Sequence, residues 1–180
     1  MRVLSERGRI HFCGGSRVYA VHVADDGNRV VVGGRSLSVV MYDCSSRALP
    51  PSPVWTAEGR DFTYTVALTD TFCAFAGTGR VVQVVSSTTG DNLFKFSVSG
   101  TVQSICMFRH FLAVSVVEAG TTAVYNLQTA AEVLCLPSVF GAVNYVTLDE
   151  DALCIASGHQ ASMYGGGGDF SWQQVPDYYV

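Results

Sequence analysis

Short apolar runs and polar turns alternate along almost the whole chain. The runs are rich in Val, Tyr, Phe and Thr, the turns are rich in Gly, Ser and Asp, and almost no window has the apolar spacing of a helix. Turns of about two to five residues predict antiparallel meanders, because parallel strands need long crossover connections. The pattern predicts strands over residues 18–23, 29–33, 37–42, 62–68, 72–76, 81–86, 92–98, 102–108, 111–117, 121–127, 132–136, 143–149, 152–157, 161–164 and 169–175.

Two segments far apart in the chain share one order of residue types. Residues 36–49, SLSVVMYDCSSRAL, and residues 121–136, TTAVYNLQTAAEVLCL, each run from small polar residues into an apolar stretch, then to Tyr with Asp or Asn, a polar turn and a second apolar stretch. The first and third strands of successive groups both recur at intervals of roughly 40 residues. A period of about 40 residues with four strands per unit is typical of a β-propeller blade.

The period divides a single domain, residues 1–180, into four units. Continuous apolar runs such as VVV at 30–32 fit blades that are covered on both faces by their neighbours. We therefore predict an all-β, β-propeller-like fold of about four blades, each of four antiparallel strands. It is a small closed ring, a half-ring that another chain completes, or part of a larger propeller, and residues 9–13 (RIHFC) read as an additional outer strand. The units span about 18–61, 62–101, 102–142 and 143–175.

This order of elements resembles the WD-repeat β-propeller family over about residues 18–175. Tyr42-Asp43 and Tyr125-Asn126 lie where the Trp-Asp pair of the family would fall, and Tyr164-Gly165 is a weaker match. The chain lacks the His that often precedes the first strand in the family and the Asp of the turn between second and third strands. The resemblance is therefore to a degenerate WD repeat. A turn with glycine comes before each unit, at Gly14-Gly15, Gly59, Gly100 and Gly141.

Composition and charge narrow the classes of function. Hydrophobic residues make up 48 % of the chain and charged residues only 14 %, which fits buried sheets or a surface covered by partner subunits. The net charge of −4 argues against nucleic-acid binding, which needs a basic surface. No segment has the length of a membrane span or the apolar core of a signal peptide, and the six cysteines form no CxxC pair. We expect a soluble, cytoplasmic protein in a reducing compartment, without membrane insertion.

A search for chemistry along the chain nominates no catalytic group. The GGGG at 165–168 lacks the Lys-Ser/Thr of a phosphate loop, the four histidines have no shared spacing, and Asp25-Asp26-Gly27 reads as a hairpin turn. No GxSxG or SxxK motif occurs. We therefore expect no enzyme activity, no cofactor and no metal. The alternatives are a regulatory propeller domain of a longer protein, or a propeller with a small-molecule or catalytic site in its central channel.

One face of the predicted disc carries the candidate binding residues. In WD-like propellers the turn before the first strand and the turn between the second and third strands lie on the same face. Arginine is favoured at protein interfaces. The predicted function is a non-catalytic protein–protein interaction scaffold, a subunit of a larger complex, whose partners are other proteins or another copy of the chain that completes the ring. The residues predicted to gather on this face are Arg17, Arg35, Arg60, Arg80, Glu118 and His159.

Overall fold

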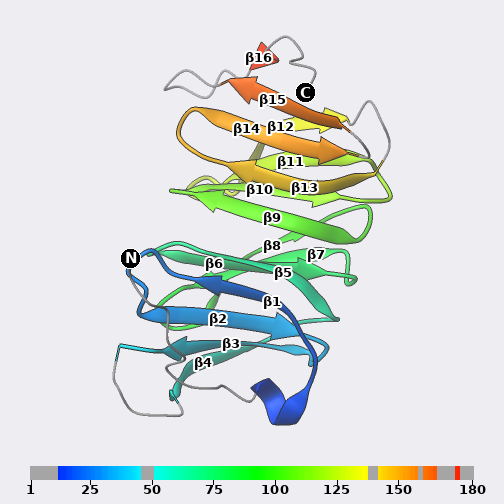
Figure 1. Ribbon diagram of the computed structural model, residues 1–180. Helices are drawn as coiled ribbons and strands as arrows, with labels where there is room; N and C mark the ends of the chain where they lie inside the picture. The colour runs from blue at the N-terminus through cyan, green and yellow to red at the C-terminus, as the bar shows by residue number, and fades with distance from the viewer. Residues whose placement is uncertain (1–11, 46–50, 138–141, 158–159, 166–172, 175–180) are drawn as a thin grey trace, which may run out of the picture.

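The computed structural model describes residues 12–45, 51–137, 142–157, 160–165 and 173–174. These residues form a short 3-10 helix over Phe12–Gly15 and four antiparallel sheets of four strands each, in which the strands follow one another in chain order. Each sheet is one blade, and the blades are stacked in chain order from the bottom to the top of Figure 1.

The strand bounds are as follows. Blade 1 holds β1 (Val18–Val23), β2 (Arg29–Gly34), β3 (Ser38–Asp43) and β4 (Pro53–Glu58). Blade 2 holds β5 (Thr63–Leu68), β6 (Phe72–Gly77), β7 (Val81–Ser86) and β8 (Asn92–Ser97). Blade 3 holds β9 (Val102–Phe108), β10 (Phe111–Val116), β11 (Thr121–Asn126) and β12 (Ala131–Pro137). Blade 4 holds β13 (Val143–Leu148), β14 (Ala152–Ser157), β15 (Gln160–Gly165) and β16 (Gln173–Gln174).

Each blade has two faces because side chains alternate along a strand. We call the face toward the preceding blade the upstream face and the face toward the next blade the downstream face. In blade 2, Val66 and Phe75 are paired across β5 and β6 and point upstream, into a cluster with blade 1. Their neighbours Ala67 and Ala74 point downstream, into a cluster with blade 3. Apolar residues are needed on both faces, which explains the continuous apolar runs.

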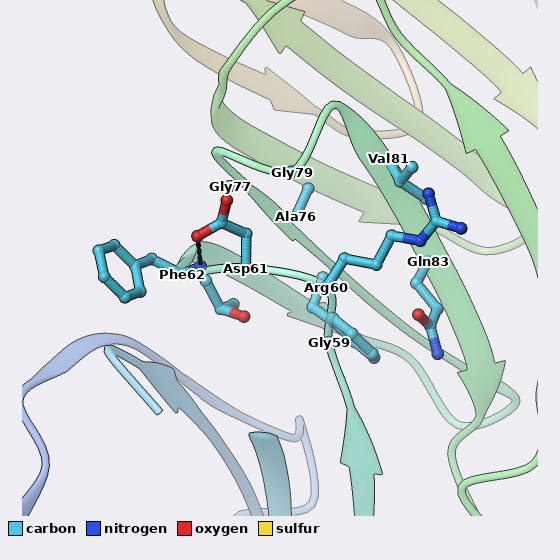
Figure 2. Close-up of a pocket in the computed structure, with 11 residues that line it drawn as sticks. Gly59, Arg60, Asp61, Phe62, Ala76, Gly77, Gly79, Val81 and Gln83 are labelled. Atoms are coloured by element: carbon cyan, nitrogen blue, oxygen red, sulfur yellow. Dashed lines mark hydrogen bonds between the residues drawn. The ribbon is translucent and has the colours of Figure 1, made fainter. Parts of the chain in front are cut away.

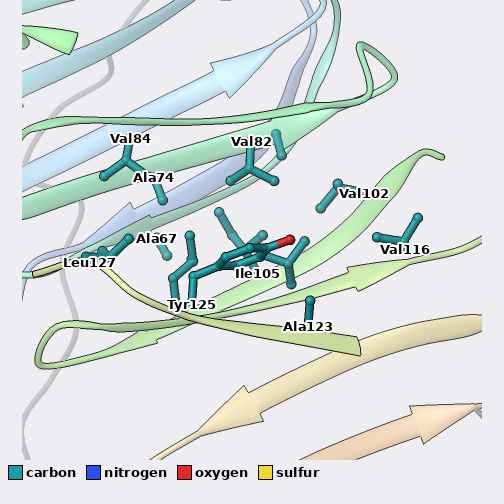
Figure 3. Close-up of a cluster of buried hydrophobic side chains, with 13 residues drawn as sticks. Ala67, Ala74, Val82, Val84, Val102, Ile105, Val116, Ala123, Tyr125 and Leu127 are labelled. Atoms are coloured by element: carbon teal, nitrogen blue, oxygen red, sulfur yellow. The ribbon is translucent and has the colours of Figure 1, made fainter. Parts of the chain in front are cut away.

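The interface between blades 2 and 3 joins small side chains to large ones (Figure 3). Ala67 and Ala74 leave room on blade 2 for Ile105 and Tyr125 of blade 3. Phe96 stacks on the Tyr125 ring with 4.4 Å between ring centroids. Each fully buried aliphatic side chain contributes about 1.5–3 kcal/mol of hydrophobic stabilisation. The blades are therefore held together mainly by apolar packing between sheets.

The four blades form an open stack. Clusters of buried apolar residues join blade 1 to blade 2, blade 2 to blade 3 and blade 3 to blade 4. The first strands carry much of this packing, β1 against β5, β5 against β9 and β9 against β13. Among the described residues no comparable packing joins blade 1 to blade 4, and the two lie at opposite ends of the stack (Figure 1). The four blades thus form an arc, as expected for a half-ring or for part of a larger propeller, and not the small closed ring that was the third predicted arrangement.

One strand is present that was not expected, one expected strand is wrong, and one expected strand lies mostly outside the described residues. The strand β4, Pro53–Glu58, was not predicted, because it begins at a proline and only Trp55 and Ala57 are buried. In place of an outer strand at 9–13, residues Phe12–Gly15 form a 3-10 helix, and residues 9–11 lie outside the described part of the chain. Of the strand expected over 169–175, the structure describes only Gln173–Gln174.

Candidate protein-binding rim

One rim of the stack is formed by the turns between second and third strands together with the segments that enter the first strands. Backbone hydrogen bonds join these two parts in each of the first three blades. Arg35 N donates to Arg17 O at 2.9 Å in blade 1, Thr78 N donates to Phe62 O at 3.3 Å in blade 2, and Val117 N donates to Thr101 O at 3.0 Å in blade 3. We call this edge the arginine rim.

The structure brings four predicted arginines and one acid to the arginine rim. Arg17 and Arg35 are neighbours in blade 1, and the Arg35 guanidinium lies 5.9 Å from the ring centroid of Phe62, at the entry to blade 2. Arg80 lies in the tight turn between β6 and β7 with φ of 54°. The members of the set that the structure describes, all of them exposed, are Arg17, Arg35, Arg60, Arg80 and Glu118. His159 lies outside the described residues.

Glu118 has a local structural role that the sequence did not predict. Its carboxylate accepts hydrogen bonds from Thr101 N at 2.5 Å and from Thr101 Oγ1 at 2.7 Å, and so ties the β10–β11 turn to the segment that enters β9. The hydrogen bond from the Thr101 side chain is the main cause that lowers the pKa of Glu118, and the charge of Arg80 adds a smaller effect. Glu118 therefore presents a fixed negative charge beside Arg80.

A small hollow lies at the arginine rim where blade 1 leads into blade 2 (Figure 2). It is lined by Gly59, Arg60, Phe62 and Gln83 among others, and the Arg60 side chain extends past Gln83 toward Val81. Its volume of about 20 Å³ is enough for a single water molecule. Sites for small molecules usually measure about 300–1,000 Å³. The hollow is therefore a feature of loop packing at the rim.

The opposite rim carries ion pairs between neighbouring blades. Arg29 Nη2 lies 2.9 Å from Asp70 Oδ1, between blades 1 and 2, and Arg109 Nη2 lies 2.8 Å from Glu150 Oε1, between blades 3 and 4. In each pair, the arginine belongs to the earlier blade and the acid to the later one. Exposed pairs of this kind contribute little to stability. They nevertheless indicate which charges meet when two blades pack.

The two ends of the stack expose apolar side chains that are not among the predicted binding residues. Val21 and Val23 of β1 are 56 % and 52 % exposed, and Tyr145 and Met163 of blade 4 are 61 % and 44 % exposed. The alternation of apolar residues in β1 predicts an apolar face, yet nothing in the sequence says whether a neighbour covers it.

The described residues offer neither a metal site nor a membrane span. No three His, Cys, Asp or Glu side chains gather closely enough among them to hold a metal ion. Within the same residues, no helix has the length and apolar character that crossing a membrane requires. Of the described cysteines, Cys73 is buried, Cys44, Cys106 and Cys154 are half-buried, and Cys135 is exposed on the outer strand β12.

Comparison with known proteins gives a clear result for the fold. No protein-family model matches the chain, and no curated protein matches it in sequence. A structure of U3-55K matches with a TM-score of 0.76 and 13 % identity, over 92 % of this chain and 54 % of that chain. The crystal structure of RRP9 WD40 repeats matches with a TM-score of 0.74 and 14 % identity, over 92 % of this chain and 53 % of that one.

The computationally designed protein Ika4 matches with a TM-score of 0.77 and 13 % identity, over 92 % of this chain and 100 % of that chain. The chain thus spans about half the length of the two WD40 proteins and the whole length of the designed propeller. The predicted all-β propeller-like fold and its likeness to WD40 propellers are confirmed. The chain has the fold of a WD40-type β-propeller arc, built from four blades of four antiparallel strands.

Proposed function

We propose that the chain is a non-catalytic scaffold for protein–protein association and a subunit of a larger complex. The observation that carries this proposal is the open stack, whose two end faces expose Val21, Val23, Tyr145 and Met163. Contiguous apolar surface on a folded domain marks sites where other proteins bind. The WD40-type fold supports the proposal, because such propellers commonly serve as interaction platforms.

The arginine rim is the second binding surface in this proposal. Arg17, Arg35, Arg60 and Arg80 present exposed guanidinium groups along blades 1 and 2, with the carboxylate of Glu118 at the edge of blade 3. Guanidinium groups bind carboxylates with two parallel hydrogen bonds and are frequent anchors at interfaces. We propose that this rim binds an acidic segment of a partner protein, with His159 as a further contact. Nucleic acid is not a proposed partner, because the net charge is −4.

Charge reversal tests the proposed rim. The variant with Arg17, Arg35, Arg60 and Arg80 all changed to Glu is compared with the wild type in affinity purification followed by mass spectrometry. We expect proteins retained by the wild type to be lost by the variant. Lys95→Glu is the matched control, because Lys95 is also an exposed cation but lies on the outer strand β8. If both variants retain the same proteins as the wild type, the rim is not a binding surface.

A second candidate function follows from the comparison of lengths. Because the chain spans about half of the WD40 proteins that it matches, we also propose a regulatory propeller domain whose remaining blades belong to a longer polypeptide. The free thiols of the described cysteines support a reducing, cytoplasmic location in either case. Further blades in the full-length transcript from the source organism would favour this second function over the first.

A further inference from the structure

The upstream face has equivalent positions in all four blades. Strand pairing aligns Val21 of β1, opposite Val32, with Val66, Ile105 and Val146 of the later first strands. In blades 2 to 4 this side chain packs against the preceding blade and is at most 7 % exposed. In blade 1 it is 56 % exposed. Val21 is therefore apolar like its three equivalents, but no preceding blade of the described chain packs against it.

Val23, two residues further along β1 on the same face, differs from its equivalents in exposure in the same way. Val23 is aligned with Leu68 and Leu148, which are 6 % and 5 % exposed, whereas Val23 is 52 % exposed. The outer strands serve as a control for this comparison. Val54, Leu93 and Val133 lie on the fourth strands of blades 1 to 3 and are similarly exposed in all three, between 42 % and 49 %. At these two aligned positions of the upstream face, therefore, the side chain of blade 1 is more than half exposed, whereas those of Val66, Ile105 and Val146 and of Leu68 and Leu148 are buried.

Another part of the same upstream face, on β2 and β3, is covered by the 3-10 helix that precedes β1. Phe12 packs against Val32, Val40 and Tyr42 of blade 1. On the later blades this place is taken by aromatic residues of the preceding fourth strand, Trp55 in the cluster with Val85 and Phe96 stacked on Tyr125. Among the described residues, nothing equivalent covers the part of the upstream face around Val21 and Val23.

Blade 4 carries the matching downstream face. Strand pairing aligns Thr147, Cys154 and Met163 with Cys106, Ala113 and Val124 of blade 3, which pack against blade 4 or lie at its interface. Val124 is 0 % exposed but Met163 is 44 % exposed. The downstream positions again combine small side chains on the first two strands with a larger one on the third. The exposed faces of blades 1 and 4 thus carry residues at the same positions that form the two sides of the interface between blades 3 and 4.

These two halves lie at opposite ends of the open stack, so one chain does not bring them together (Figure 1). The chain covers only 54 % and 53 % of the two WD40 chains that it matches. We infer that a second copy of the chain packs its blade 4 on blade 1 of the first copy, and its blade 1 on blade 4, so that two chains form one ring of eight blades. This inference rests on the proposed scaffold function and names the occupant of the end faces.

The contacts between blades 3 and 4 indicate how the new interface is formed. Cys106 Sγ lies 3.7 Å from Leu148 O across that interface. Thr147 is aligned with Cys106, and Val23 is aligned with Leu148. In the proposed ring the Thr147 hydroxyl would therefore donate a hydrogen bond to the carbonyl oxygen of Val23 in the second copy. Ser104 Oγ approaches both Val146 N and Val146 O within 3.4 Å. Tyr145 replaces this serine in blade 4 and contributes an aromatic contact instead of the short hydroxyl.

Charge gives the ring a distinctive dependence on salt. In the pairs Arg29–Asp70 and Arg109–Glu150 the earlier blade supplies the cation. The aligned turn of blade 4 holds only acids, Asp149-Glu150-Asp151. In the proposed ring it would face the turn of blade 1 that contains Asp25 and Asp26, in which, among the described residues, only Asp26 has a nearby cation, with Arg29 Nε 3.6 Å from its Oδ2. Like charges repel, and salt screens them over about 10 Å at 0.1 M. Association of the two copies is therefore expected to strengthen as the salt concentration rises.

The mass of the full chain in solution, measured by light scattering over a dilution series, tests the inference. We expect a dimer of twice 19.3 kDa. Val23→Asp and Met163→Asp each bury an unpaired charge in the interface and are expected to weaken the dimer at least about 30-fold. Val133→Asp is the matched control, with 47 % exposure on an outer strand, and is expected to leave the dimer unchanged. Circular dichroism checks that each variant is folded.

Mixing the two interface variants tests the arrangement. A Val23→Asp chain keeps an intact blade 4 and a Met163→Asp chain keeps an intact blade 1, so a mixed pair has one undamaged interface. The mixture is expected to associate more tightly than either variant alone. A wild-type chain that stays at 19.3 kDa at every concentration, or a mixture no tighter than its components, overturns the inference. A monomer that still loses its bound proteins on charge reversal of the arginine rim refutes only the ring and leaves the scaffold function standing.

Discussion

Trp55 and Gly90 form the contact that most directly tests how blade 1 is held to blade 2. The Trp55 ring is buried between the blades, and its Nε1 donates a hydrogen bond to Ser87 O at 3.0 Å. Gly90, with φ of +76°, lies under the same ring, so that a Cβ there would be 2.9 Å from ring atoms of Trp55. The two residues belong to different blades and fit together only in the folded structure.

The magnitudes follow from these contacts. Trp55→Ala loses about 3–5 kcal/mol through the cavity it leaves, and a further loss of about 1–3 kcal/mol comes from the unpaired Ser87 carbonyl. Gly90→Ala costs about 1–2 kcal/mol for the left-handed backbone and about 1–3 kcal/mol for the clash with the ring. The clash is absent when Trp55 is already alanine. The double variant is therefore expected to be about 1–3 kcal/mol more stable than the sum of the single effects predicts.

Urea unfolding of the wild type, the two single variants and the double variant, followed by circular dichroism, measures this coupling. Gly59→Ala is the control, because a Cβ at Gly59 meets its nearest atom at 3.5 Å and is expected to change stability little. Additive effects within about 0.5 kcal/mol would refute the packing of Trp55 on Gly90. A loss below about 1 kcal/mol for Trp55→Ala would refute its role between the blades.

Four further results are expected. Gly34→Ala and Gly77→Ala, whose Cβ atoms would press on the carbonyl oxygens of Arg17 and Phe62, should each lose about 1–3 kcal/mol in the same urea assay, and wild-type stability in both would contradict the close approach. Burial raises the pKa of Cys73 to about 12, so the unfolded thiol ionises first and stability should fall from about pH 9 to pH 12, less steeply in Cys73→Ala; equal slopes would refute this. A thiol reagent should label the exposed Cys135 in the native protein and Cys73 only after unfolding, and the reverse order in peptide mapping would show that their burial is misassigned. Because the Thr101 hydrogen bond lowers the pKa of Glu118, its stabilising effect should be present at neutral pH and lost as the pH falls through the folded pKa; a melting temperature of Glu118→Gln equal to that of the wild type at pH 7 would argue against it.

Much of the fold could be predicted because the first three strands of blades 2 and 3 carry apolar residues on both faces. The spacing from Tyr42 to Tyr125 and Tyr164 reflects a real equivalence, since all three side chains are buried at the same place in their blades. The tight turn between the first two strands could also be predicted from its residue types. Gly27 adopts φ of +70° and its N–H donates to Ala24 O, as the sequence Asp25-Asp26-Gly27 predicts for a tight turn.

Other features depend on neighbours that no local pattern specifies. The strand β4 has only two buried residues and begins at Pro53, so its pairing with β3 and the burial of Trp55 decide its existence. The role of Glu118 comes from its proximity to Thr101, which is 17 residues away. The exposure of Val21 and Val23 could not be predicted either, because an apolar strand looks the same in sequence whether a blade covers it or not.

Small-angle X-ray scattering of the purified chain tests the two-chain ring most directly, because one curve gives both the mass and the shape of the particle. A two-chain ring has twice the mass of 19.3 kDa and a radius of gyration of at least about 21 Å. A particle of 19.3 kDa with a radius of gyration of about 16 Å would contradict it.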